Sequence, residues 1–174
     1  MRNLELRYYP DPVLRRVSDT VDAFDDELRE LAEGMVATMH RERGIGLAAP
    51  QVGLTRRLIV VLQMKTPEDT EADPLVLVNP RVVSTGGELW SYDEGCLSIP
   101  GVTAAVLRPA QVGVEYQDLQ GEIHRIVDES MLGRILLHEI DHLDGRLFID
   151  CISDAQKSLV KSQLKDLARG KRSS

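Results

Sequence analysis

The stretch LLHEIDHLDG at residues 136–145 restricts the fold more than any other part of the chain. It sets two histidines and three acids among three leucines and one isoleucine. The apolar pattern predicts a core helix over about 129–143, ended by Gly145. A buried polar group without a partner costs about 1–3 kcal/mol. The chain must therefore fold around this helix and supply partners for its polar side chains.

The histidines of this helix have the spacing of a metal site. His138 and His142 are four residues apart, so both imidazoles project from one helix face, with Glu139 beside them. The pattern H-E-x-x-H binds one metal ion through its two histidines. The alternative is a pair of locally bonded histidines with a solvated Glu139. The apolar flanks favour the metal site, because one ion would satisfy both rings.

The residues leave the third metal ligand open. One zinc motif requires a histidine where this chain has Phe148, and residues 143–174 contain neither histidine nor glutamate. Cys96 is the best candidate, because it lies in a predicted tight turn and a thiolate binds divalent ions strongly. Its alternative role is that of a small buried apolar residue. The other candidates are His40, His124, Asp144, Asp150, Asp154 and Asp166.

The remaining patterns predict an α+β fold, with mostly antiparallel sheets packed around the HExxH helix and with an N-terminal and a C-terminal helix. The expected elements are a helix over 25–42, strands over 57–63, 75–79 and 81–88, a turn-rich segment over 93–101, a hairpin over 111–117 and 122–128, and a helix over 154–169. Residues 148–152 are ambiguous. Without a long linker, the 174 residues predict a single domain.

The composition narrows the classes of partner and the cellular compartment expected for this chain. The net charge of -7 argues against a general nucleic-acid-binding surface. Two cysteines are too few for a disulfide framework, which favours a reducing, cytoplasmic compartment. The start lacks the apolar core of a secretory signal, and no apolar run is long enough to span a membrane.

Three motifs together resemble a known family. GIGLAAPQVG (44–53), EGCLS (94–98) and HEIDHLDG (138–145) are similar, in this order, to the signatures of peptide deformylases of the bacterial type. The similarity runs from about residue 4 to 153, which suggests a catalytic core over 1–153 followed by a helix and tail over 154–174. The resemblance implies that Cys96 is the third ligand and that the fourth position is open. It also implies iron(II) as the ion, for which Zn²⁺, Ni²⁺ or Co²⁺ can substitute.

The implied reaction removes the N-formyl group of formylmethionine from nascent peptides and releases formate. Glu139 can act as the general base and then as the acid. The resemblance assigns the stabilisation of the oxyanion to the side-chain amide of Gln51 and the backbone N–H of Leu97. The alternatives are a metallopeptidase that cleaves ordinary peptide bonds and a degenerate, non-catalytic relative.

Several further residues are expected near the substrate. Ile45 and Gly46 are predicted to contact it, because glycines let an extended peptide pair with exposed backbone. Glu94 and Arg108 resemble residues that structure the family's pocket; the alternatives are a turn acid and a surface charge. The family's pattern has an arginine where this chain has Thr103, which predicts weaker substrate binding.

The final helix carries a regular basic pattern. Its basic residues recur every four positions and form one stripe: Lys157, Lys161, Lys165 and Arg169. Leu159, Leu164 and Leu167 are predicted to pack on the domain. The resemblance implies docking of this helix near the ribosomal tunnel exit, where phosphates would attract the stripe. The alternative is an ordinary solvated helix face.

Overall fold

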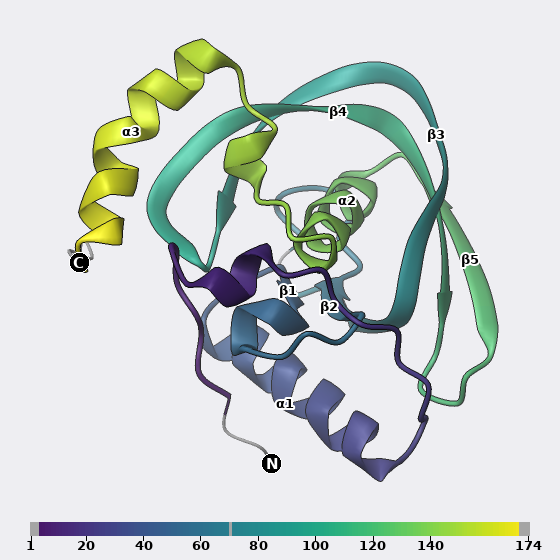
Figure 1. Ribbon diagram of the computed structural model, residues 1–174. Helices are drawn as coiled ribbons and strands as arrows, with labels where there is room; N and C mark the ends of the chain where they lie inside the picture. Colours follow the sequence, from purple (N-terminus) through teal and green to yellow (C-terminus); the bar gives the residue numbers. More distant parts are fainter. Residues whose placement is uncertain (1–3, 70, 171–174) are drawn as a thin grey trace.

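The structure is a computed structural model that describes residues 4–69 and 71–170. These residues form helices around a β-sheet (Figure 1), which confirms the α+β class. The elements are η1 (Pro12–Arg15), α1 (Asp26–Arg41), β1 (Gly46–Ala48), η2 (Ala49–Val52), β2 (Leu58–Leu62), β3 (Pro74–Cys96), β4 (Ile99–Gln117), β5 (Ile123–Asp128), α2 (Met131–Leu143), η3 (Phe148–Asp150) and α3 (Asp154–Ala168), where η marks a 3₁₀-helix. In the described ranges, no helix combines the length and apolarity needed to cross a bilayer.

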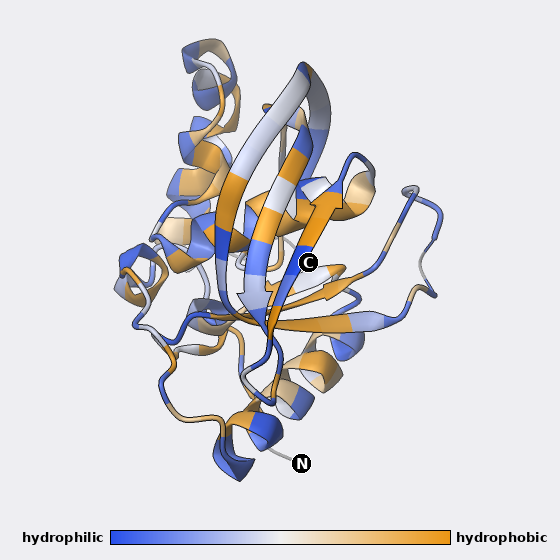
Figure 2. Cartoon of the chain, turned by 90° about the vertical axis from the view of Figure 1, so that its right-hand side faces the viewer, coloured by the Kyte–Doolittle hydropathy of each residue, from blue (hydrophilic) through white to orange (hydrophobic). Residues whose placement is uncertain are grey.

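The strands form one antiparallel sheet in the order β1-β2-β3-β4-β5. The long hairpin of β3 and β4 curves around α2, which lies at the centre of the molecule (Figure 1). Orange and blue segments follow one another along the hairpin in Figure 2. Over residues 102–108 of β4, buried residues alternate with more exposed ones, because successive side chains face opposite sides of the sheet. β2 is buried at every position, since β1 and β2 lie between α1 and α2.

Strands β3 and β4 are longer than the sequence predicted. The segments 75–79 and 81–88 belong to the single strand β3, and the turn-rich segment 93–101 contains only a two-residue turn, at Leu97 and Ser98. β3 stays paired with β4 across irregularities near Val78, Val82, Gly86 and Gly95. Bulges of this kind absorb turn-forming residues without ending the strand, so the glycines and Pro80 misled the sequence interpretation.

Local contacts set one end of each of the two core helices. The Asp25 carboxylate accepts a hydrogen bond from Leu28 N–H at 3.0 Å and caps α1. Gly145, just beyond α2, has a φ of 71°. A Cβ there would lie 2.5 Å from the Arg15 carbonyl oxygen, so both conformation and space require glycine.

The C-terminal helix α3 packs beside β4, at the outer side of the long hairpin (Figure 1). Val160 and Leu167 are buried there, and Leu164 packs against the same cluster. The prediction for Leu159 was wrong: this side chain is 79% exposed, because Val160 lies on the inner face in its place. Residues 171–174, the end of the expected tail, lie outside the described part.

Candidate active site

Three side chains from two elements converge beside α2. Cys96 Sγ, at the end of β3, and the imidazole nitrogens of His138 and His142 on α2 all lie within 4.8 Å of one another. Cys96 Sγ is 3.3 Å from His142 Nε2. A thiolate and two imidazoles suit a divalent transition metal and leave a fourth position open, as in catalytic sites. The residues therefore fit the expected ion.

The other candidate ligands do not join this group. Asp144 is ion-paired with Arg57, and Asp150 with Arg15. His124 bonds instead to Asp118, at 2.7 Å. Over 4–69 and 71–170, none of the remaining candidates, His40, Asp154 and Asp166, belongs to the cluster either.

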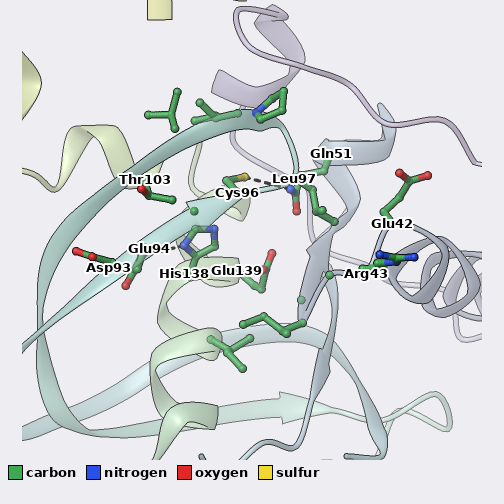
Figure 3. A pocket seen from close by; sticks show the side chains of 18 of the residues that line it. Glu42, Arg43, Gln51, Asp93, Glu94, Cys96, Leu97, Thr103, His138 and Glu139 are labelled. Atoms are coloured by element: carbon green, nitrogen blue, oxygen red, sulfur yellow. Dashed lines mark hydrogen bonds and ion pairs between the residues drawn. The ribbon is translucent and has the colours of Figure 1, made fainter. Parts of the chain in front are cut away.

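A buried carboxylate orients His138. Glu94 Oε2 accepts a hydrogen bond from His138 Nδ1 at 2.9 Å (Figure 3), which turns Nε2 of that ring toward Cys96 and His142. Burial raises the pKa of Glu94, but hydrogen bonds from His138 and Arg108 outweigh it and hold the pKa at about 2. Burial lowers the pKa of His142 well below its ordinary range, which favours the neutral form of this imidazole.

Two arginines hold the same carboxylate. Arg108 binds Glu94 in a bidentate pair of 2.6 and 2.9 Å and reaches Asp141 at 2.9 Å. Arg134 donates to Glu94 Oε1 at 2.7 Å. Glu94 is therefore no exposed turn acid and Arg108 no surface charge, since each is 6% exposed. Arg108 does not line the cleft.

Glu139 lies beside the cluster with its carboxylate buried (Figure 3). Burial raises its pKa to about 7. Its Oε2 has no hydrogen-bond partner within the described ranges. A Cβ at Gly46 would lie 2.4 Å from Glu139 Oε1, so the glycine makes room for this carboxylate. A carboxyl group with such a pKa can both accept and return a proton near neutral pH.

Gln51 and Leu97 offer donors next to the sulfur. Gln51 Oε1 accepts a hydrogen bond from Ala48 N–H at 2.8 Å, which directs Nε2 toward Cys96 Sγ at 3.4 Å and Ser98 Oγ at 3.2 Å. Leu97 follows Cys96 in the turn. Its backbone N–H finds no backbone acceptor among the turns and loops of the described residues.

A cleft of about 570 Å³ opens onto these groups. Ile45, which is 41% exposed, stands at its mouth, and Thr103 lies on the wall formed by β3 and β4. Figure 3 shows Cys96, His138 and Glu139 between these walls. Much of the lining is apolar: Leu6, Ile45, Leu97, Ile99, Pro100, Val102, Met131 and Ile135. The cleft can therefore take an apolar side chain next to a reacting carbonyl.

The comparisons with known proteins agree with this geometry. The family model described as polypeptide deformylase matches residues 3–158. The chain belongs to the peptide deformylase family. The peptide deformylases of Picosynechococcus sp. and Bartonella tribocorum are 47% and 45% identical to it over 162 residues, which cover 93% of this chain and 84% and 91% of theirs.

Solved peptide deformylases also share the fold. A plant peptide deformylase, PDF1B, matches with a TM-score of 0.91 and 38% identity over 98% of this chain and 91% of its own. The enzyme of Synechococcus elongatus, solved in complex with actinonin, matches with a TM-score of 0.85 and 44% identity over 92% of this chain and 87% of its own.

The family assignment fixes the reaction. As a member of this family, the chain is a metal-dependent hydrolase that removes the N-formyl group from formylmethionine at the amino terminus of newly synthesised proteins and releases formate. The family and the Cys–His–His cluster together imply a divalent metal ion. The expected family is thereby confirmed, in preference to a metallopeptidase of ordinary peptide bonds.

Sequence reasoning missed part of the site. Arg134, Asp141 and Ser98 all contact predicted site residues, yet none was singled out. Arg134 carried a usable signal, because it is a charged residue one turn before His138 on an apolar helix. Ser98 carried none, since a serine in a turn is ordinary.

Proposed function

We propose that Cys96, His138 and His142 hold the metal ion and that Glu139 transfers the proton during deformylation. The observation that supports these roles is the buried, unpartnered Glu139 carboxylate beside a Cys–His–His cluster in an apolar cleft. Glu139 faces the cleft next to a ligand, which suits a base and not a fourth ligand.

A divalent ion at this cluster would supply a nucleophilic water at neutral pH and polarise the formyl carbonyl. Glu139 accepts the proton as the new C–O bond forms at the formyl carbon. It then passes this proton to the amine nitrogen as the C–N bond breaks. Gln51 Nε2 and Leu97 N–H donate to the oxygen that becomes negative in between. The bond from Ala48 N–H fixes the Gln51 amide in the orientation that donates.

Ile45 and Gly46 are the proposed contacts for the peptide. β1 is an edge strand, paired with β2 on one side only. An extended formyl-peptide can therefore add to its open side, with Ile45 against the substrate's apolar side chain. Glu94 and Arg108 act on the substrate only through His138, because they orient that ring and pair with each other.

The proposed native ion is iron(II), with zinc in its place after aerobic handling. A thiolate with two imidazoles accommodates both, so reactivity distinguishes them. An iron(II) enzyme should lose activity in air and keep it when oxygen is excluded. Undiminished activity of the iron form after prolonged aeration would count against iron.

Metal analysis of anaerobically purified protein, combined with formate release, tests the site. Cys96→Ala should lose most of its metal and its activity. Cys151→Ala is the matched control, because Cys151 lies outside the cluster, and it should keep both. Full occupancy in Cys96→Ala would remove Cys96 from the ligand set. The formylated peptide should be hydrolysed and its unformylated counterpart left intact.

The proposed setting follows from the substrate. Because nascent formylmethionyl peptides are the substrate, we propose that the enzyme acts in the cytoplasm, close to the ribosome. The stripe of Lys157, Lys161, Lys165 and Arg169 is exposed along α3 and is available for docking near the tunnel exit. We assign 1–153 to the catalytic core of a single domain and 154–174 to this helix and tail.

A further inference from the structure

Arg134 is a buried arginine on α2, one turn before His138. Its side chain is 3% exposed, although the removal of a charge from water is unfavourable unless the charge is well paired. Residues four apart on a helix project from one face, so Arg134 and His138 point toward the same neighbours. The contacts of Arg134 indicate what its charge does there.

The guanidinium group connects three elements. Its Nη1 donates to Glu94 Oε1 at 2.7 Å and to the Val106 carbonyl oxygen on β4 at 3.2 Å. Its Nη2 donates to the Trp90 carbonyl oxygen on β3. Arg134 therefore ties α2 to both strands of the long hairpin, at the level of the metal cluster.

Two aromatic rings fix the plane of the same group. The guanidinium carbon lies 4.6 Å from the ring centre of Trp90 and 5.6 Å from that of Tyr92. Cation–π contacts of this kind favour a planar guanidinium over a lysine ammonium. Tyr92 and Arg134 also line the cleft. The side chain thus has one defined position, although its Nε has no partner within 4–69 and 71–170.

We propose that Arg134 is a positioning residue that sets the Glu94 carboxylate and, through it, the ring of His138. This inference rests on the proposed role of His138 as a metal ligand. The two carboxylate oxygens of Glu94 accept hydrogen bonds from different sets of donors. Oε1 accepts from both arginines, whereas Oε2 accepts from Arg108 and from His138 Nδ1.

The position of Arg134 on α2 gives it a role that Arg108 does not have. Arg108 belongs to β4 and reaches α2 only through a second carboxylate, that of Asp141, so it joins Glu94 to this helix indirectly. Arg134 links Glu94 to the helix that carries His138 and His142. Because Glu94 is held by an arginine from the sheet and by one from the helix, it keeps the His138 ring in a fixed position relative to Cys96 on β3. Without Arg134, the direct contact that remains between α2 and this carboxylate in the described ranges is the bond from His138, beside the indirect link through Arg108 and Asp141.

Cobalt(II) binding to purified, metal-free protein tests the inference, with the absorption of the cobalt–thiolate bond as the signal. Arg134→Leu should weaken cobalt affinity about 10-fold, the lower end for loss of a group that supports a metal ligand. Arg57→Leu is the matched control, because Arg57 also bonds to a carboxylate and a carbonyl oxygen, outside the cleft. It should bind cobalt as the wild type does, even where its Tm falls by as much.

A second measurement reports on the ring itself. In the zinc-loaded protein, the proton on His138 Nδ1 gives a hydrogen-bonded NMR signal that should exchange faster with water in Arg134→Leu than in Arg57→Leu. Wild-type cobalt affinity together with an unchanged exchange rate would overturn the inference. Failure of the wild type itself to show the cobalt–thiolate band would instead overturn the proposed metal site.

Arg134→Lys keeps the test decisive if Arg134→Leu does not fold. A lysine ammonium can reach Glu94 but cannot bond to Glu94, Val106 and Trp90 with the geometry of a planar fork. Its cobalt affinity should fall a few-fold, between those of wild type and Arg134→Leu. Wild-type affinity in Arg134→Lys would show that charge alone suffices and would overturn the positioning role.

Discussion

Helices α2 and α3 both carry charged or polar residues at helical spacing, yet they use them in opposite ways. On α2, Arg134, Glu139 and His142 are buried within an apolar helix. On α3, the basic residues 157, 161, 165 and 169 are all exposed. A buried polar group needs a partner, whereas an exposed lysine needs none. The apolar surroundings, and not the spacing, therefore mark α2 as the functional helix.

The largest effect is expected when the proposed catalytic group on α2, Glu139, is replaced and the proposed metal ligands are kept. Glu139→Gln should lower kcat by about 10²–10⁴-fold, because it removes the proton acceptor. Metal content should stay at the wild-type level, since Glu139 is not a proposed ligand. Formate release and metal analysis of the same sample measure both. Retained turnover, or loss of the metal, would contradict the division of roles within α2.

The second prediction concerns the space around that carboxylate. Gly46→Ala places a Cβ 2.4 Å from Glu139 Oε1, so the carboxylate must move. Displacement of a catalytic group by about 1 Å can cost ~10²-fold in rate. Gly86→Ala is the control, because its Cβ would meet only the flexible end of Gln111, at 3.1 Å, outside the cleft. Equal activity of the two variants would mean that Glu139 tolerates the shift.

The contrast between buried and exposed polar residues also explains which features could be predicted from the sequence. Apolar background around His138 and Glu139 made the central helix recognisable, and three motifs made the family recognisable. The continuity of β3 was missed, because bulges hide turn-forming residues inside a strand. The support for Glu94 was also missed, because Arg108 and Arg134 meet it only after β3, β4 and α2 pack together. GIGLAAPQVG suggested peptide pairing, whereas contact with Glu139 is visible only in three dimensions.

A third prediction compares how the two helices begin. Asp128 Oδ1 accepts hydrogen bonds from the N–H groups of Ser130, just before α2, and of Gly133, in its first turn. Its Oδ2 pairs with Lys65 at 2.7 Å. On α3, the exposed Ser153 side chain accepts from Gln156 N–H at 3.3 Å. Asp128→Ala should cost about 1–2 kcal/mol in unfolding free energy, more than Ser153→Ala.

The difference in unfolding free energy between Asp128→Ala and Ser153→Ala should depend on pH. Burial raises the pKa of Asp128, but the bonds from Lys65, Ser130 and Gly133 outweigh it, so the pKa lies below its ordinary value of 3.8. A lowered pKa means that the stabilisation is complete above pH 3.8 and is lost as the pH falls through the folded-state value. Urea unfolding at about pH 7 and about pH 3 measures this. A cost of Asp128→Ala that is equal at both pH values would rule out its charge as the cause.

The smallest effect on catalysis is expected from substitutions in the basic stripe of α3, because none of its residues lines the catalytic cleft. Lys161→Glu/Lys165→Glu should hydrolyse a free formyl-peptide at the wild-type rate, because neither residue lines the catalytic cleft. If α3 docks on the ribosome, this double variant should bind ribosomes more weakly, and the salt dependence of binding should become shallower by roughly one unit of slope per lost phosphate contact. Arg16→Glu/Arg125→Glu changes the net charge equally at exposed positions on other elements. A loss confined to the α3 variant would make the stripe a docking surface. Equal losses of ribosome affinity in both double variants would show that the stripe is ordinary charge on a solvated helix. Of the two helices, only α2 would then have a function.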